Sequence, residues 1–257
     1  MTKREGSNEF FYLANDIDFN GYEAPHAVNA FSGVLYGAGH TIKNAPFSQT
    51  SDSGLFQKLG EKDDVAIVKL NLGSEDLPII VQNQGSYATV GVLASYCNSG
   101  YTLVVSDVNV YADIGGTGRY FAGFVGRASD FACYDSNFYG DVVLVYQTNW
   151  ESFASGFVAW SEKCSVGAQF AESGYSGSCY MAYDMKMVNC KNFARINFYA
   201  SNWDKEAGYY FIMGAAGFVG KNDKSVTSIV GCTNLGDIIS NKKDENYVSP
   251  FVFYGHC

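Results

Sequence analysis

A triplet of glycine followed by two apolar residues recurs along the chain, and its spacing limits the possible folds more than any other feature. Copies begin at Gly54, Gly91, Gly123, Gly156 and Gly217, and a variant copy begins at Pro250. Successive copies are 37, 32, 33, 61 and 33 residues apart. A fixed period of this length is typical of repeat architectures. The long interval indicates an insertion, which we place at Gly167 to Asp184.

A second motif follows four of the triplets and strengthens the repeat. It begins at Asn109, Asn137, Asn192 and Asn234, and it ends with a charged residue before an apolar one. The charged residues are Asp113, Asp141, Arg195 and Asp237. Two motifs in a fixed order at one period are much stronger evidence for a repeat than either motif alone.

The residues between the triplets alternate in a way that is typical of strands. From Val104 to Ile114 the even positions are apolar apart from Ser106, whereas the odd positions include Asp, Asn and Tyr. This period of two predicts one buried and one solvated face. The 28 glycines and the many Asn, Ser, Tyr, Phe and Val residues also favour strands joined by tight turns. We expect helix to be a minor component at most.

A period near 33 residues fits one turn of a β-solenoid. Three strands of about 5–6 residues and three turns of about 2–6 residues total roughly 21–36 residues. One such coil cannot bury its own inner face, so the coils must stack. We therefore predict a single all-β domain over residues 1–257. It would be a right-handed parallel β-helix of about seven or eight coils with one projecting loop. The alternative is a β-propeller, whose blades need about 40–50 residues.

Composition and charge exclude several classes of function. The chain has 17 basic and 26 acidic side chains and a formal net charge of −9. Phosphate recognition needs clustered Lys and Arg, so we expect no nucleic-acid partner. No apolar run is long enough for membrane insertion, and residues 1–20 lack the apolar core of a signal peptide. Seven cysteines without a Cys-x-x-Cys pair and three histidines predict no zinc or haem site and no cofactor.

The N-terminal segment contains the most specific motif of the chain. The run from Tyr12 to Asp18, Tyr-Leu-Ala-Asn-Asp-Ile-Asp, is followed by a Phe-x-Gly-x-x-x-Gly-x-Gly-His-x-Ile segment from Phe31 to Ile42. Together they resemble the entry coils of GLUG-motif β-helix proteins. The Gly-Phe-Val triplets and Asn-x-Gly-Asp-Ile motifs resemble the later repeats of that family. The resemblance covers nearly the whole chain apart from about residues 167–184, and it implies adhesion or scaffolding at a bacterial surface.

Metal-binding and catalytic motifs are incomplete. Asp16, Asp18 and Asn20 imitate the opening of a calcium loop, but Ala27 occupies the twelfth position, where a bidentate Glu is needed. Residues 174–178, Gly-Tyr-Ser-Gly-Ser, miss the Gly-x-Ser-x-Gly elbow by one residue. We expect His40 to be a turn or core residue. We predict no metal site, no catalytic residue and no enzyme.

The four charged residues that end the second motif should form a column on one face of stacked repeats. A column of carboxylates can bind calcium or serve a polysaccharide lyase. The simpler interpretation is that each Asp is a turn residue that accepts hydrogen bonds from nearby backbone amides. No clustered Lys or Arg provides a lyase base, which favours the turn interpretation.

The cysteines are also spaced with the repeat. Cys97, Cys133, Cys164 and Cys257 follow the start of their triplets by 6, 10, 8 and 7 residues, which predicts that they stack along one edge. Free thiols pack as small hydrophobic groups, and the missing signal peptide favours reduced thiols. Disulfides are the alternative, because the spacing of stacked strands is compatible with disulfide geometry.

Aromatic residues in polar connections provide the best indication of a binding surface in the sequence. Trp150, Trp203, Tyr209 and Tyr210 precede the triplets at Gly156 and Gly217. Such rings stack on sugars, although they also shield strand edges. We take these four residues as candidate glycan contacts.

The sequence therefore leaves three functions open. The first is a non-enzymatic binding or adhesion module of a surface protein. The second is a structural subunit that assembles with other chains through exposed solenoid ends. The third is a polysaccharide-degrading enzyme. The resemblance implies an extracellular location, whereas the lack of a signal peptide and the odd number of cysteines leave an intracellular one open.

Overall fold

The computed structural model describes residues 9–22, 30–146, 151–161, 184–200, 213–222, 226–241 and 248–255. Among these residues there is no helix, and the secondary structure consists of strands in three sheets. All the strand pairs of these sheets are parallel. The prediction of an all-β chain with parallel sheets is confirmed.

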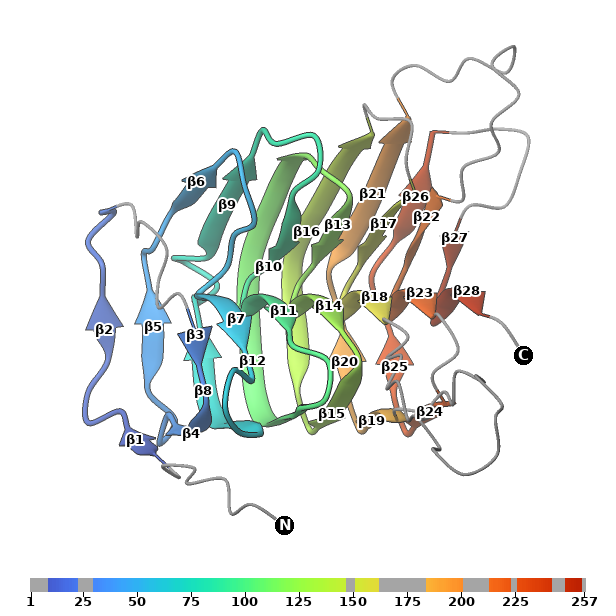
Figure 1. Cartoon of the computed structure of the whole chain (residues 1–257). Helices are drawn as coiled ribbons and strands as arrows, with labels where there is room; N and C mark the ends of the chain where they lie inside the picture. The colour runs from blue at the N-terminus through green and yellow to red at the C-terminus, as the bar shows by residue number, and fades with distance from the viewer. Residues whose placement is uncertain are drawn as a thin grey trace, which may run out of the picture.

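The smallest two sheets take one strand from each successive repeat. The seven-stranded sheet contains β3 (Ala30–Phe31), β7 (Phe56–Leu59), β11 (Ala94–Cys97), β14 (Val125–Ala128), β18 (Val158–Ser161), β23 (Val219–Asn222) and β28 (Val252–Gly255). The five-stranded sheet contains β10 (Thr89–Gly91), β13 (Tyr120–Ala122), β17 (Ser152–Ser155), β22 (Met213–Ala216) and β27 (Val248–Ser249). In Figure 1 the short strands of the seven-stranded sheet form a row, and the colour along this row follows the chain from blue to red.

The third sheet has sixteen strands and contains the longest ones. They are β1 (Phe10–Tyr12), β2 (Ile17–Asp18), β4 (Gly33–Tyr36), β5 (Thr41–Lys43), β6 (Phe47–Gln49), β8 (Val65–Leu72), β9 (Ile79–Asn83), β12 (Thr102–Thr117), β15 (Asp130–Tyr134), β16 (Asn137–Tyr146), β19 (Asp184–Val188), β20 (Lys191–Asn192), β21 (Arg195–Ala200), β24 (Val226–Val230), β25 (Thr233–Asn234) and β26 (Ile238–Ser240). From β8 onward, the repeats thus contribute in turn to the large, the five-stranded and the seven-stranded sheet, whereas β1 to β7 belong to the large and the seven-stranded sheets only.

The Gly-apolar-apolar triplet makes the corner between the two smaller sheets. Gly123 follows β13, and the second apolar residue of the triplet, Val125, begins β14. A Cβ on Gly123 would overlap the carbonyl oxygen of Gly156, and a Cβ on Gly156 would overlap that of Gly217. The triplet needs glycine because the backbone of the following repeat passes too close for any side chain.

The middle residues of the triplets build the centre of the core. Phe124, Phe157 and Phe218 are fully buried, and their rings stack with centroids 4.6 and 4.8 Å apart. Phe251 continues the column at 5.5 Å. These spacings match the distance between neighbouring strands of a sheet, about 4.8 Å. The column shows that equivalent residues of successive repeats lie directly beside one another.

The strand alternation predicted for residues 104–114 is correct in its second half only. Val108 and Val110 are buried as expected, but in the first half the buried residues are Leu103 and Val105, not the even positions. The phase changes at Asp107, which has a left-handed backbone with φ of 56°. At such a bend the alternation of inward and outward side chains shifts by one residue, so the buried positions are odd before it and even after it.

The same bend recurs in successive repeats. Lys69, Asp107, Asp135, Asn189 and Gly231 all have a positive φ, and the strand registers place them opposite one another. Asp, Asn and Gly adopt this conformation most readily. The many Asp and Asn residues thus mark the bends of the large sheet.

The charged residues of the second motif align as predicted. Asp113 lies opposite Asp141, which lies opposite Arg195. The amide of Ile196 donates to the carbonyl of Asp237, which places Asp237 next in the column.

The asparagines that begin the motif do not all align with one another. Asn137 lies opposite Asn109 and Lys191, whereas Asn192 lies opposite Phe138 and Asn234. The motif is one residue shorter in the last two repeats, so its first residue moves to the other face of the sheet. Asn192 is therefore buried while Asn137 is partly exposed.

The predicted insertion at 167–184 lies outside the described residues except for Asp184, which is the first residue of β19. The strands before and after this connection keep the order of the earlier repeats, because β15 pairs with β19 and β18 pairs with β23.

Candidate functional site

The four aromatic residues that sequence predicts as glycan contacts lie outside the described residues. Trp150, Trp203, Tyr209 and Tyr210 fall in the connections 147–150 and 201–212. The structure therefore neither places them nor brings them together.

A different column of aromatic side chains lies on the outer surface of the large sheet. The rings of Tyr111 and Tyr139 stack with centroids 4.4 Å apart and an interplanar angle of 7°. Tyr139 and Phe193 stack in the same way, at 4.7 Å and 6°. All three side chains are partly exposed. The sequence signal for this column is an aromatic residue two positions before three of the four charged residues of the second motif, and the sequence predictions above did not include it. Before the fourth, Asp237, this position is Leu235.

Tyr111 is the end of this column, and its outer ring face has no aromatic neighbour. The strand β12 pairs with β8 as far as Val110, which lies opposite Leu72, and with β9 from Ala112, which lies opposite Ile79. Tyr111 therefore lies opposite the loop 73–78, which begins with Gly73. Among the described residues, only Tyr139 makes a ring contact with Tyr111. One face of the Tyr111 ring is thus stacked on Tyr139, and in the described part of the chain no aromatic ring covers the other face.

A groove lies at this open face. It has a volume of about 380 Å³ and is lined by Ser74, Glu75 and Pro78 of the loop and by Tyr111, Asp113 and Tyr139 of the sheet. Burial raises the pKa of Tyr139, and the neighbouring Tyr111 hydroxyl raises it further. The volume is within the range of small-molecule sites, about 300–1,000 Å³.

Both sides of the groove are held by contacts of their own. The Tyr111 ring is supported by the stacked rings of Tyr139 and Phe193. On the loop side, the Ser74 amide donates to the Leu77 carbonyl, and the Leu77 amide donates to the Ser74 hydroxyl at 3.2 Å. A preformed site loses little conformational entropy when it binds.

The charges in the groove are negative. Asp113 accepts a hydrogen bond from the Asp141 amide at 3.1 Å, but neither Asp113 nor Glu75 forms an ion pair with any described residue. In the next repeat, by contrast, Arg195 binds Asp141 through two hydrogen bonds of 3.0 and 3.2 Å. The negative charge of the column is therefore offset at Asp141 and remains at Asp113.

The incomplete calcium motif forms turns. Asp16 accepts hydrogen bonds from the Thr41 amide and from His40 Nδ1, and Asp18 accepts them from the Asn20 amide and the Asn44 side chain. These hydrogen bonds lower the pKa of both carboxyl groups. In the part of the chain that the structure describes, no group of three or more His, Cys, Asp or Glu side chains is arranged to hold a metal ion. His40 is a turn residue, as predicted.

The predicted column of cysteines is wrong for the two members that are described. Cys97 lies in the seven-stranded sheet opposite Leu59, whereas Cys133 lies in the sixteen-stranded sheet opposite Val105 and Met187. Cys97 is the last residue of β11, the strand that follows its triplet, whereas Cys133 lies beyond the corresponding strand β14, in β15 (Asp130–Tyr134). Cys164, Cys179 and Cys257 lie outside the described residues.

Three thiols instead gather beside the bend of the large sheet. Cys190 donates through Sγ to the Cys133 carbonyl at 3.5 Å, and its amide lies 3.3 Å from Cys232 Sγ. The hydrogen bond with the Cys133 side chain raises the pKa of Cys190 to about 12. All four described cysteines are free thiols. The pKa values of Cys97, Cys190 and Cys232 are raised, which makes these three thiols poor nucleophiles. Cys97, Cys133 and Cys190 are buried and pack as core residues.

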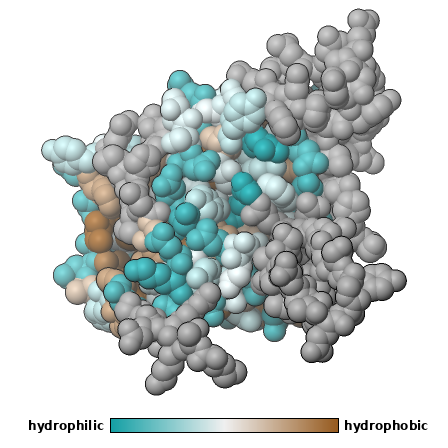
Figure 2. Space-filling view, in the orientation of Figure 1, coloured by the Kyte–Doolittle hydropathy of each residue, from teal (hydrophilic) through white to brown (hydrophobic). Residues whose placement is uncertain are grey.

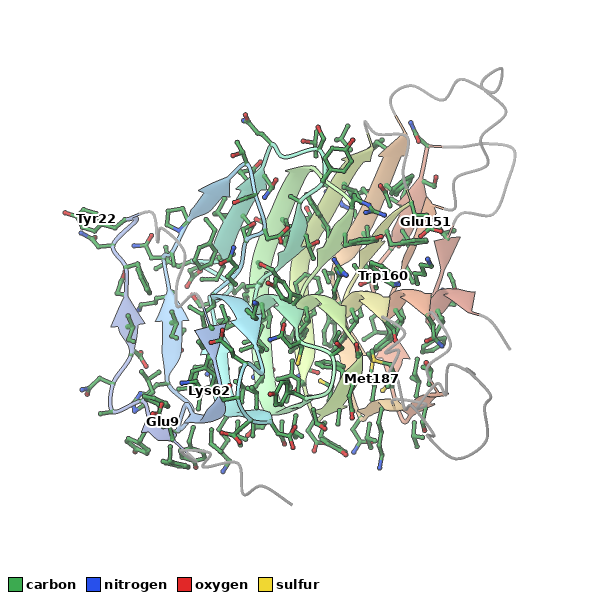
Figure 3. The ribbon with its side chains drawn as sticks, viewed as in Figure 1. Glu9, Tyr22, Lys62, Glu151, Trp160 and Met187 are labelled. Carbon is green, nitrogen blue, oxygen red and sulfur yellow. The ribbon has the colours of Figure 1, made fainter. Side chains whose placement is uncertain are left out.

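A column of alternating cations and aromatic rings runs along the seven-stranded sheet. Lys58, Tyr96, Arg127, Trp160 and Lys221 follow one another in register. The Arg127 guanidinium and the Lys221 ammonium lie 4.5 and 5.1 Å from the centre of the Trp160 ring, and Lys221 also pairs with Glu151. Figure 3 shows Trp160 and Glu151 on the same side of the molecule. Both faces of Trp160 are occupied by cations, so this column stabilises the sheet and leaves no ring face for a ligand.

Comparisons with known proteins give no match. No family model, no curated protein and no solved structure matches the chain. Among the described residues there is also no helix that is long and apolar enough to cross a membrane.

Proposed function

We propose that the chain is a β-solenoid, a right-handed parallel β-helix, which works as a non-enzymatic carbohydrate-binding module of the adhesion type. The solenoid interpretation is supported by the strand order. From β8 onward the chain visits the three sheets in turn, and strands of one repeat pair with the equivalent strands of the neighbouring repeats. Parallel strands joined by a crossover are almost always connected with a right-handed turn.

One observation carries the binding function, namely the open ring face of Tyr111 at the wall of a groove. A sugar ring presents a flat array of C–H groups that packs on an aromatic face, while carboxylates and hydroxyls accept and donate hydrogen bonds at its edge. Ser74, Glu75 and Asp113 supply such groups around Tyr111. The rigid stack of repeats holds these groups in one geometry without a need for reorganisation.

The test is the binding of a panel of neutral, acidic and amino-sugar oligosaccharides by titration calorimetry. We expect at least one oligosaccharide to bind the chain, and the substitution Tyr111→Ala to weaken this binding by about tenfold or more, as loss of an aromatic contact predicts. Tyr87→Ala is the matched control, because Tyr87 is 62% exposed and does not line the groove.

Two results would contradict the proposal. Unchanged binding by Tyr111→Ala would place the sugar elsewhere. Release of new reducing ends during incubation would replace the binding module by the third function, a polysaccharide-degrading enzyme.

Assembly through the ends of the stack is a second candidate, and the exposed apolar residues at both ends favour it. Phe10, Tyr12 and Ile17 are exposed at the first repeat, and Val230 and Leu235 at the last described ones. Figure 2 shows hydrophobic residues at the left edge of the molecule, where β2 lies. Strand edges with exposed apolar side chains pair readily with other strands. A second copy of this chain, stacked end to end, would cover both edges by a repeating contact.

This second candidate is tested by light scattering over a hundredfold range of concentration. End-to-end stacking predicts a mass that grows with concentration. A chain with Ile17→Lys and Leu235→Lys should remain monomeric, since like charges on the two edges that meet oppose pairing. A wild-type mass that stays monomeric throughout would exclude it.

A further inference from the structure

We infer that the groove at Tyr111 selects sugars that carry a free ammonium group, as in polymers of glucosamine, over neutral or acidic sugars. This inference rests on the proposed carbohydrate-binding function and adds the class of ligand.

The charge of the groove is the first argument. Its lining includes the carboxylates of Glu75 and Asp113 but no Lys, Arg or His. Neither carboxylate forms an ion pair with any residue in the described ranges. An acidic sugar would bring a third negative charge into this space. A protonated amine instead supplies the missing counter-ion, and a charge-assisted hydrogen bond is about twice as strong as a neutral one.

The aromatic wall is the second argument, and it also favours a ligand with an ammonium group. The face of a tyrosine ring carries partial negative charge and attracts a cation within about 6 Å of its centre. The open face of Tyr111 borders the same groove as Glu75 and Asp113. An amino sugar can use the ring face and a carboxylate at once, whereas a neutral sugar uses only the stacking contact.

The position of Asp113 within its column is the third argument. The negative charge of the neighbouring Asp141 is offset by the ion pair with Arg195. The Asp141 backbone amide donates a hydrogen bond to Asp113 Oδ1 at 3.1 Å. The column therefore fixes the Asp113 carboxylate and leaves its charge available at the edge of the groove. The net charge of −9 further attracts a cationic polymer over long distances.

The flat shape of the ring surface favours a sugar over a basic peptide. The wall is a stack of nearly parallel rings, with angles of 7° and 6° between successive members. The open end of this stack is a flat platform that matches a pyranose face, whereas a lysine side chain is a flexible rod. A rigid ring also loses less conformational entropy on binding than a side chain with four rotatable bonds.

The experiment compares the tetramer of glucosamine with the tetramer of N-acetylglucosamine, by calorimetry on the full chain at low and high salt. We expect the glucosamine tetramer to bind at least tenfold more tightly and to lose affinity as salt increases. Asp113→Asn and Glu75→Gln should each reduce that preference several-fold, while Asp113→Asn can still accept the hydrogen bond from the Asp141 amide. Asp237→Asn is the control, because Asp237 belongs to the same column but does not line the groove.

The outcomes separate this inference from the function on which it rests. If the two tetramers bind equally and Tyr111→Ala removes both, the groove binds sugars without selecting an amine, and only this inference is wrong. If neither tetramer binds, the inference is wrong, and the oligosaccharide panel decides the proposed function separately. If tetralysine binds as tightly as the glucosamine tetramer, the ligand is a basic peptide and the sugar class is wrong.

Discussion

At the scale of single residues, the glycines of the triplets are required by the neighbouring repeat rather than by their own turn. A Cβ on Gly156 would meet the Gly217 carbonyl and the Asn192 side chain. Gly115 differs, because a Cβ there would contact only the Gln82 side chain, at 3.1 Å or more. Backbone cannot move aside without shifting the whole repeat, whereas a glutamine side chain can.

The substitution Gly156→Ala should therefore destabilise the protein by about 1–3 kcal/mol, the usual cost of overpacking. Gly115→Ala should change stability by no more than about 0.5 kcal/mol. Denaturant unfolding of both variants measures the difference. Equal stability of the two variants would contradict the close approach at the triplet.

Cys97 shows how burial controls reactivity at one residue. Burial raises the pKa of this thiol to about 12, and its Sγ lies within reach of the Asn98 and Tyr101 carbonyls. The thiolate is the reactive form, so a thiol with this pKa reacts slowly at pH 8.

We expect iodoacetamide at pH 8 to modify Cys97 in the folded chain far more slowly than in urea, as measured by peptide mass spectrometry. The pKa of Cys97 is higher in the folded than in the unfolded state, so the protonated thiol contributes to the stability of the folded chain. This contribution is complete below about pH 8.5, the ordinary thiol pKa. It is lost as pH rises toward 12. Equal rates of labelling in the two states would refute this description of the site.

At the scale of elements, stacked side chains of successive repeats stabilise the strands. The phenylalanine column fills the core, and an asparagine column joins strands at the surface. In it, Asn109 donates to Asn71 at 3.0 Å, and Asn137 donates to Asn109 at 2.8 Å. Each contact repeats at the strand spacing, so a single sequence motif stabilises several strands at once.

The phenylalanine column predicts a gradient of stability. Phe157 is fully buried between two other rings, and Phe157→Ala should cost about 3–5 kcal/mol. Phe251 has one ring neighbour and is 38% exposed, so Phe251→Ala should cost clearly less. Thermal and denaturant unfolding measure both values, and an equal loss for the two variants would contradict the column as the centre of the core.

The elements also show where sequence periodicity succeeds and where it fails. Alternation correctly predicts a strand over 104–114, but it does not reveal the left-handed bend at Asp107 that exchanges the two faces. The same applies to Asn192, whose face depends on one missing residue in its motif. A shift of one residue is small in sequence and reverses the direction of a side chain in a strand.

At the scale of the whole molecule, the strand pairs of the three sheets join neighbouring repeats. The long central strand β12 pairs with β8, β9, β15 and β16. Within the described residues, the strands of the first repeat have partners on one side only, since β1 pairs with β4 and β2 with β5. In such an architecture stability is a sum of local and nearest-neighbour terms.

Hydrogen exchange should therefore be graded along the chain. We expect amides of β12 to be protected most and those of β1 and β2 to exchange orders of magnitude faster, because edge repeats open without unfolding the rest. Exchange measured by mass spectrometry on peptides from these strands checks this. Uniform protection along the chain would mean that the repeats unfold only as one unit.

The sequence by itself determined the strand class, the repeat near 33 residues, the glycine corners and the column of charged residues from Asp113 to Asp237. These features follow from spacing and from backbone preferences, which are local properties of the chain. Only the tertiary structure decided which face Asn192 occupies, which cysteines meet, and that Tyr111 ends a stack of rings beside a groove. Those features depend on the residue that lies opposite in the next repeat, and bends and one-residue shifts change that partner without changing the period.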